Sequence, residues 1–237
     1  MIEEIVQTNA LEYMASFSDD TFDLIILDPD YQDWENLISE GIINQAMRVL
    51  KPTGNVLCFT KQPFGFKLRT AADPYFRREI VWTFDNGGAG CSPKMPLVST
   101  QKIYWLIKSK EFYFNPRTGL AYSSTTKDFK RKSKVFGDYE SEGKQFLKST
   151  DGIWLRDHLH YNKPNAGKIP AKPQTLIDVL VRCFSPEDGK VLDPFAGTGT
   201  SICAAEKNAR SVWACDIDES RVHKILDAYF AEGAGTV

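Results

Sequence analysis

Three aspartates each stand directly after a short apolar segment of the chain. They are Asp28 after the segment FDLIIL, Asp193 after KVL, and Asp216 after SVWAC. Each apolar segment has the length and composition of a buried β-strand. In open α/β sheets, ligands bind outside the carboxyl ends of the strands. The sequence therefore predicts three carboxylates at the ligand-binding edge of one sheet.

The segment DPFAGTGT, residues 193–200, lies between a predicted strand and a predicted helix. Gly197 and Gly199 allow a tight turn there and a close approach of a ligand to the backbone. The Thr200 hydroxyl and the first amides of the helix could bind a carboxylate or a phosphate. Asp216 follows 19 residues after Gly197, where an acid can accept hydrogen bonds from ribose hydroxyls. The third glycine of a dinucleotide fingerprint is missing, so the pattern favours a nucleoside cofactor other than NAD; a purely structural turn and a surface acid are the alternative.

The tetrapeptide DPDY, residues 28–31, follows the apolar strand 22–27 directly. On its own, an Asp-Pro pair followed by a polar residue is typical of a turn. Beside the predicted cofactor turn, it indicates a catalytic carboxylate at Asp28 with an aromatic ring, Tyr31, close to it.

Helices alternate with short apolar strands at both ends of the chain, which predicts an open, mostly parallel α/β sheet with helices on both faces. The expected strands are 2–6, 22–27, 55–60, 78–84, 102–107, 190–192 and 211–215. The expected helices are 9–17, 35–50, 173–184, 200–207 and 218–230, with a short helix around Leu68. Residues 51–54 (KPTG) are expected to end the helix 35–50 before the next strand begins.

Length and composition describe one ordinary globular domain that can carry an insertion: 237 residues, 42% hydrophobic and 25% charged. No apolar run approaches the roughly 20 residues of a membrane span, and the start of the chain has no pattern of a secretion signal, so we expect a cytoplasmic protein. Five cysteines without a C-x-x-C pair and three histidines indicate reduced thiols and no metal site. We also expect His158 and His160 to be exposed loop residues, and Trp34, Trp82 and Trp105 to pack in or near the core.

The middle of the chain differs from both ends in pattern and in charge. Regular periodicity is lost over residues 108–168, where aromatic side chains alternate with basic ones. Residues 108–172 contain 14 Lys and Arg against 7 Asp and Glu, whereas the rest of the chain contains 15 against 24. Such a basic segment either faces a polyanion or is a solvated surface.

Together, these motifs resemble the β-type family of DNA amino-methyltransferases, which act on the N6 amine of adenine or the N4 amine of cytosine. The family's catalytic motif is Asp/Asn/Ser-Pro-Pro-Tyr/Phe and its cofactor turn is Phe-x-Gly-x-Gly; here these positions read DPDY (28–31) and FAGTG (195–199). The segment IPAKP, 169–173, resembles the family's His-Pro-Thr-Gln-Lys-Pro segment, and the order of the motifs matches the β-type permutation. Asp30 stands where the family usually has proline.

The resemblance implies a Rossmann-like methyltransferase fold, with residues 1–107 and 169–237 as the catalytic core and 108–168 as an inserted target-recognition region. It implies S-adenosylmethionine as the cofactor and double-stranded DNA with a flipped-out base as the partner, and it allows a homodimer. The catalytic residues would be Asp28, Pro29 and Tyr31. The cofactor would be bound by Lys172, Asp193, Phe195, Gly197, Thr198, Gly199, Thr200 and Asp216. The DNA backbone would be bound by Lys127, Lys130, Arg131, Lys132 and Lys134.

The expected activity is site-specific methylation of adenine N6 in a bacterial or phage-infected cell, because family members that act on cytosine more often carry serine at the position of Asp28. Cytosine N4 methylation is one alternative. An RNA or small-molecule methyltransferase is another, and the long basic segment argues against a small substrate. The extra carboxylate of Asp30 leaves a third alternative, a nucleic-acid-binding protein that holds the cofactor without turnover.

Overall fold

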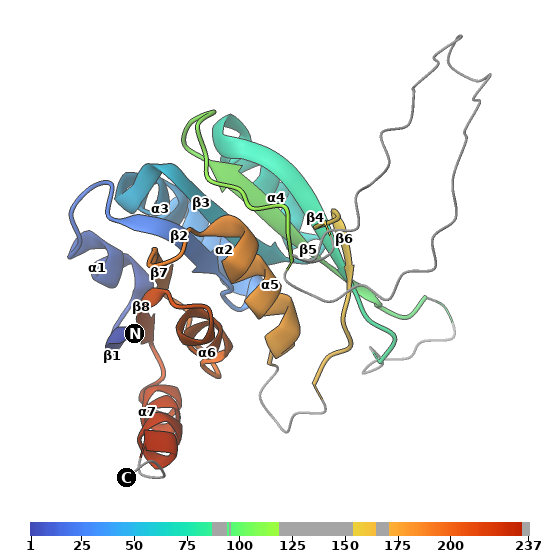
Figure 1. Ribbon diagram of the computed structural model, residues 1–237. Coiled ribbons are helices and arrows are strands. Elements are labelled where there is room, and N and C mark those ends of the chain that lie inside the picture. Colours follow the sequence, from blue (N-terminus) through green and yellow to red (C-terminus); the bar gives the residue numbers. More distant parts are fainter. Residues whose placement is uncertain (87–93, 95, 119–153, 165–170, 234–237) are drawn as a thin grey trace, which may run out of the picture.

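The computed structural model describes residues 1–86, 94, 96–118, 154–164 and 171–233. These residues form one mixed sheet of eight strands with helices packed on both of its faces (Figure 1). In spatial order, the strands are β1 (Ile2–Gln7), β8 (Ser211–Asp216), β7 (Lys190–Asp193), β2 (Phe22–Leu27), β3 (Leu50–Thr60), β5 (Thr100–Ile107), β4 (Phe76–Thr83) and β6 (His158–His160).

The first five strands in this order are mutually parallel, and β5 is antiparallel to both of its neighbours. The short strand β6 pairs in parallel with β4. The expected mostly parallel α/β sheet is confirmed. Its consequence for function is that β8, β7 and β2 present their carboxyl ends side by side.

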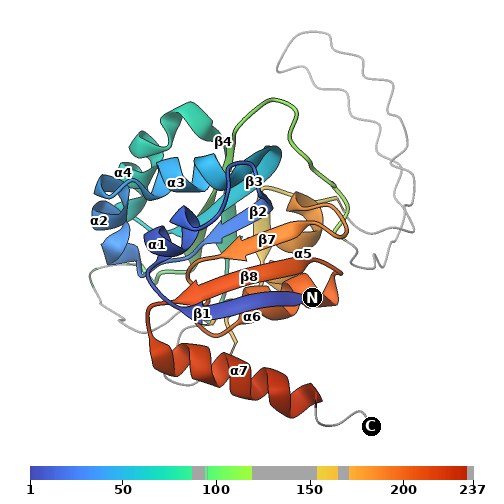
Figure 2. The ribbon, with the colours of Figure 1, turned by 90° about the vertical axis from the view of Figure 1, so that its left-hand side faces the viewer.

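The helices form two layers, as Figures 1 and 2 show. One layer contains α1 (Ala10–Ala15), α2 (Trp34–Ser39), α3 (Ile42–Val49) and α4 (Phe64–Ala71); the other contains α5 (Gln174–Phe184) and α6 (Thr200–Lys207). The C-terminal helix α7 (Glu219–Gly233) lies beside β1 at one edge of the sheet. Two short 3₁₀ turns, η1 (Tyr31–Asp33) and η2 (Asp73–Tyr75), complete the described elements.

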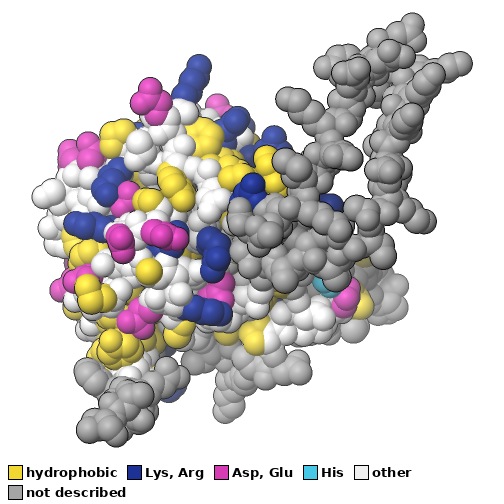
Figure 3. Space-filling model, in the orientation of Figure 1, with side chains coloured by type: hydrophobic (Ala, Val, Ile, Leu, Met, Phe, Trp, Pro, Cys, Tyr) yellow, Lys and Arg dark blue, Asp and Glu magenta, His cyan; other side chains and the backbone are white. Residues whose placement is uncertain are grey.

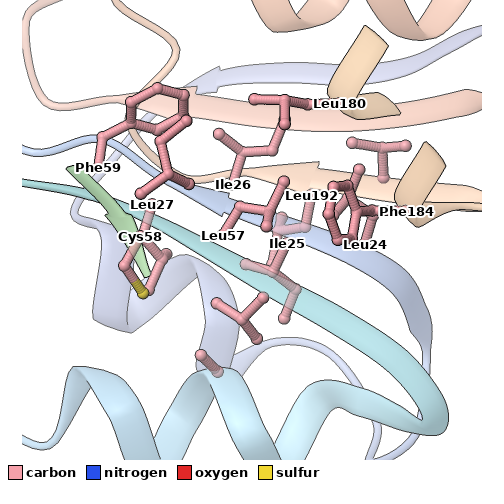
Figure 4. Close-up of a cluster of buried hydrophobic side chains, with 14 of the residues drawn as sticks. Leu24, Ile25, Ile26, Leu27, Leu57, Cys58, Phe59, Leu180, Phe184 and Leu192 are labelled. Carbon is pink, nitrogen blue, oxygen red and sulfur yellow. The ribbon is translucent and has the colours of Figure 1, made fainter. Parts of the chain in front are cut away.

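The hydrophobic core is centred on β2, all six residues of which are buried. Figure 4 shows the four apolar residues 24–27 between side chains of β3, β7 and α5. Strands that are buried on both faces are mostly apolar, which explains the uninterrupted run LIIL; the one charged residue of β2, Asp23, pairs with Lys51. Because β2 is fixed by packing on both sides, the residue that follows it is held on a rigid element.

The structure corrects three details of the predicted elements. Residues 35–50 are not one helix: the chain breaks at Gly41, which adopts a left-handed φ of 89° and precedes α3. Residues 51–54 do not separate helix from strand, because β3 already begins at Leu50 and pairs there with Phe22, with an irregular register before Leu24. The segment 108–168 is not irregular throughout, since residues 158–160 form β6.

Smaller expectations are met. Trp34, Trp82 and Trp105 are buried, and each indole N–H donates a hydrogen bond inside the fold. His158 and His160 are exposed, although they lie on β6 rather than in a loop. None of the described helices combines the length and the apolar character that crossing a membrane requires.

Candidate active site

The three strand-end aspartates lie at one edge of the sheet, as the sequence predicts. Asp28 follows β2, Asp193 ends β7 and Asp216 ends β8, and these three strands are neighbours. All three line one cavity of about 730 Å³. Every residue expected to be catalytic or to bind the cofactor lines this cavity, with the exception of Gly199: Asp28, Pro29, Tyr31, Lys172, Asp193, Phe195, Gly197, Thr198, Thr200 and Asp216.

The glycine turn between β7 and α6 depends on two left-handed residues. Gly197 has a φ of 54° and Gly199 a φ of 78°, conformations that L-residues with a side chain rarely adopt. A Cβ on Gly199 would lie 3.2 Å from Cγ1 of Ile225, so glycine also permits the close packing of α7. Gly197 lines the cavity, and a Cβ there would have Phe195 O, at 3.7 Å, as its nearest neighbour. Its missing side chain therefore leaves room for a ligand against the backbone.

Asp216 holds the glycine turn in place. Its Oδ2 accepts a hydrogen bond of 2.8 Å from the Gly197 N–H, and its Oδ1 accepts one of 2.9 Å from the Asp218 N–H. Arg221 Nη1 lies 3.6 Å from the same Oδ2. Because each carboxylate oxygen has two lone pairs, the side chain can still accept a hydrogen bond from a ligand in the cavity.

Asp193 connects the end of β7 to the start of α6. Its Oδ1 accepts a hydrogen bond of 2.9 Å from the Phe195 N–H, and its Oδ2 accepts one from the Ser201 hydroxyl. Burial raises the pKa of Asp193 to about 7, although both hydrogen bonds oppose this shift. The side chain is 4% exposed, so its main contacts are with the turn itself.

Asp28 forms an ion pair with Lys172, which lies 144 residues further along the chain. The lysine Nζ donates a hydrogen bond to Oδ2 of Asp28. The other oxygen, Oδ1, is buried and has no hydrogen-bond partner among the described residues, because the neighbouring Tyr31 hydroxyl donates its single proton to Gln101. Burial raises the pKa of Asp28 above its usual value, while the charge of Lys172 and its hydrogen bond act in the opposite direction. Asp28 thus keeps an unused acceptor atom. An unsatisfied buried acceptor lowers the stability of the fold by about 1–3 kcal/mol, unless a ligand supplies a hydrogen-bond donor.

Tyr31 lies beside Asp28 in the same cavity. Its hydroxyl donates a hydrogen bond of 2.9 Å to Oε1 of Gln101 on β5. The side chain is 9% exposed, and the Nζ atoms of Lys61 and Lys172 lie 5.5 Å and 5.7 Å from its ring centroid. Burial, followed by the charge of Asp28, raises the pKa of the hydroxyl. The phenol therefore stays neutral at physiological pH.

Several lining residues were missed by reasoning from the sequence: Lys61, Gln101, Lys163, Ser201 and Ile217. A usable signal existed for Lys61, which directly follows the predicted strand 55–60, and for Ile217, which follows the strand-end acid Asp216. Gln101 and Lys163 carry no comparable signal, because their place depends on the pairing of β4 with β5 and β6.

The five basic residues expected to bind the DNA backbone, at positions 127, 130, 131, 132 and 134, lie outside the described residues. In the view of Figure 3, basic and acidic side chains are interspersed over the described surface. No group of His, Cys, Asp and Glu with the arrangement of a metal site occurs among the described residues.

Residues 14–227 match the sequence model of a protein family described as DNA methylase, whose members modify N6 or N4 amines. The chain belongs to this family. The match includes both motifs, and the expected membership in the amino-methyltransferase family is confirmed. The expected cofactor, S-adenosylmethionine, is confirmed by this family membership together with a solved complex of a similar protein.

Three bacterial methyltransferases are similar to this chain over most of its length. Type II methyltransferase M.HpaI of Haemophilus parainfluenzae is 25% identical over 99% of this chain and 76% of that protein. Type II methyltransferase M1.MboII of Moraxella bovis is 24% identical over 94% of this chain and 95% of that protein. DNA adenine methyltransferase YhdJ of Escherichia coli K12 is 22% identical over 92% of this chain and 79% of that protein.

Solved structures confirm the fold. The complex of M1.HpyAVI with S-adenosylmethionine superposes with a TM-score of 0.70 at 18% identity, covering 97% of this chain and 99% of that chain. The cytosine-N4-specific PvuII DNA methyltransferase superposes with a TM-score of 0.66 at 15% identity, covering 98% of this chain and 93% of that chain. The Rossmann-like methyltransferase fold expected from the sequence is therefore confirmed.

Proposed function

We propose that this protein transfers a methyl group from S-adenosylmethionine to the N6 amine of an adenine that is flipped out of double-stranded DNA. The observation that carries the proposal is the position of Asp28. Its carboxylate has a buried, unpartnered oxygen and lines the same cavity as the glycine turn. An acceptor for an amine and a turn shaped for a nucleoside cofactor thus share one space.

The residues around the glycine turn fit the cofactor. Gly197 leaves its backbone open to the cavity, and Asp216 offers free lone pairs next to it. Ile217, which is 69% exposed at the cavity, offers an apolar surface to an adenine ring. Lys172, which is paired with Asp28, would also offer its ammonium group to the carboxylate of the methionine end. When bound, S-adenosylmethionine supplies an electrophilic methyl group on a sulfonium sulfur.

Asp28 and Pro29 would prepare the target amine for methyl transfer. The lone pair of an exocyclic amine is delocalised into the base, so the amine is a poor nucleophile. Hydrogen bonds from the amine to the Asp28 carboxylate and to the Pro29 carbonyl would localise that lone pair and orient it. Positioning of reacting atoms at roughly 3–3.5 Å is then the main contribution of the protein. The proton is lost after transfer, because the methylated ammonium product is acidic, so Asp28 need not be a strong base.

Tyr31 would stack against the target base. Flipping a base out of a duplex costs a few kcal/mol, which stacking in the pocket helps to offset. The ring of Tyr31 is held by the hydrogen bond between its hydroxyl and Gln101. The two lysine side chains near the ring must move aside or remain at its margin when a base stacks there.

The choice of adenine rests on Asp28, because cytosine-specific members of the family more often have serine at that position. Cytosine N4 is the second candidate, since a cytosine-N4-specific enzyme shares this fold. Asp30 adds a second carboxylate, whose charge raises the pKa values of Asp28 and Tyr31. We propose that the motif tolerates Asp30, because this residue is exposed and leaves the Asp28–Lys172 pair intact.

The basic residues of segment 108–168 would bind DNA phosphates: Lys127, Lys130, Arg131, Lys132 and Lys134. Affinity that depends on phosphate contacts falls steeply as the salt concentration rises. A DNA affinity that does not change with salt would contradict this part of the proposal.

The test compares the wild-type protein with Asp28→Asn, which keeps the shape of the side chain and removes its charge. Transfer of a labelled methyl group from S-adenosylmethionine to unmethylated DNA should be lost in the variant. Cofactor affinity, measured by calorimetry, should remain within a few-fold of the wild-type value. Full turnover by the variant would refute the assignment of Asp28.

A further inference from the structure

Three lysines converge on one side of the cavity. Lys61 directly follows β3, Lys163 stands three residues after β6, and Lys172 precedes α5; all three line the cavity. Lys172 is neutralised by Asp28. In the described part of the chain, no carboxylate oxygen lies within 4.0 Å of the Nζ of Lys61 or Lys163. Two positive charges next to the cavity therefore lack a counterion among the residues that the structure describes.

Lys163 is held in this position by its surroundings. The side chain of Asn86 accepts a hydrogen bond of 2.9 Å from the backbone N–H of Lys163 and donates one of 2.7 Å to its carbonyl. The Nζ of Lys163 lies 4.0 Å from the ring centroid of Phe84. Burial and the positive charges of Lys172 and Lys61 lower the pKa of Lys163. The three ammonium groups are thus close enough to repel one another, and an anion between them would relieve this repulsion.

The position of these lysines indicates which anion they would bind. In the sheet, the glycine turn follows β7, whereas Lys61 and Lys163 follow β3 and β6, on the other side of Asp28. Lys61 Nζ also lies 5.5 Å from the ring centroid of Tyr31, against which the target base is proposed to stack. The anion covalently attached to that base through its sugar is a backbone phosphate. The other anion available is the carboxylate of the cofactor, which is proposed above to bind Lys172.

We propose that Lys61 and Lys163 form a binding site for the backbone phosphate of the flipped-out nucleotide. This proposal rests on the proposed function and adds a specific anchor for the target strand. The site would stabilise the extrahelical nucleotide by neutralising its phosphate while Tyr31 contacts its base. Phosphate contacts position a nucleic acid and carry no sequence information, so the site would act on any target sequence.

The test uses the double variant K61Q/K163Q, with Lys224→Gln as the matched control on the exposed surface of α7. Methylation of unmethylated DNA and binding of a duplex are measured over a series of salt concentrations. Replacement of a phosphate-binding lysine reduces the slope of log affinity against log salt by about 1. We expect a reduction of about 1 for each lysine in the double variant, a raised KM for DNA, and no change in the control.

Cofactor binding separates the two sources of the anion. The dissociation constant of S-adenosylmethionine, measured by calorimetry without DNA, should be unchanged in K61Q/K163Q. A weaker cofactor affinity with an unchanged salt slope would assign the lysines to the cofactor's carboxylate and overturn the phosphate site. An unchanged slope and KM in an active variant would also overturn it while leaving the proposed function intact. Absence of methyl transfer to DNA by the wild-type protein would instead refute the proposed function.

Discussion

Replacing Lys172 with methionine should move the acidic limb of the pH–rate profile to higher pH. In the wild-type protein, Oδ2 of Asp28 is paired with the Lys172 ammonium group, and burial raises the pKa of Asp28. Methyl transfer requires the ionised carboxylate as a hydrogen-bond acceptor, so activity falls as the pH drops through this pKa. Methionine fills a similar volume but removes the positive charge, which leaves the carboxylate without its counterion.

The size of the shift follows from the contact. A hydrogen bond that involves a charged group contributes about 1.5–3 kcal/mol. One pKa unit corresponds to about 1.4 kcal/mol, so the pKa of Asp28 should rise by roughly 1–2 units. The two side chains are 15% and 23% exposed, and this partial solvation favours the lower part of that range.

The assay is kcat against pH with the cofactor and DNA at saturating concentrations, because Lys172 is also proposed to contact the cofactor. Lys172→Arg, which keeps the charge, is the matched control. The midpoint of its acidic limb in the kcat–pH profile should lie within about 0.5 pH units of the wild-type value. An acidic limb that stays in place in the methionine variant, with kcat lowered equally at all pH values, would show that Lys172 does not lower the pKa of Asp28. In that case, Lys172 would act on the cofactor and not on the ionisation of Asp28.

Three further substitutions test the scaffold of the site. Asp216→Ala removes the acceptor for the Gly197 N–H and should weaken cofactor affinity, measured by calorimetry, about tenfold or more. An unchanged affinity would show that Asp216 does not contribute to cofactor binding. The pKa of Asp193 is about 7 in the fold and about 3.9 in an unfolded chain, so the folded state favours its protonated form. Protonation of Asp193 therefore adds up to about 4 kcal/mol to the free energy of unfolding below pH 4, and this contribution is lost as the pH rises through 7. Denaturant unfolding of Asp193→Asn should lack this part of the pH dependence. Identical pH profiles for the variant and the wild-type protein would contradict the raised pKa. Gly199→Ala forces a side chain into a left-handed conformation and against Ile225, and should lower the free energy of unfolding by about 1–3 kcal/mol, which a thermal melt can verify or refute.

The sequence predicted the parts of the site that depend on local pattern. Asp28, Asp193 and Asp216 could be placed because each ends an apolar strand, and parallel strands present their ends at one edge. Gly197 and Gly199 could be placed because a strand-to-helix turn needs left-handed residues.

The remaining features depend on contacts between distant residues. The Asp28–Lys172 pair joins positions 144 residues apart, and no periodic pattern predicts such a contact. The hydrogen bond from Tyr31 to Gln101 depends on the antiparallel placement of β5 next to β3. The break at Gly41 was missed because the apolar stripe continues across it, so periodicity indicated one helix where the backbone forms two.

The central claim is that Asp28 directs methyl transfer to the N6 amine of adenine in DNA. Nucleoside mass spectrometry tests it most directly, on unmethylated DNA incubated with S-adenosylmethionine and either the wild-type protein or Asp28→Asn. We expect N6-methyladenine with the wild-type protein and no methylated base with the variant. N4-methylcytosine, or no methylated base from a wild-type protein that still binds its cofactor, would contradict it.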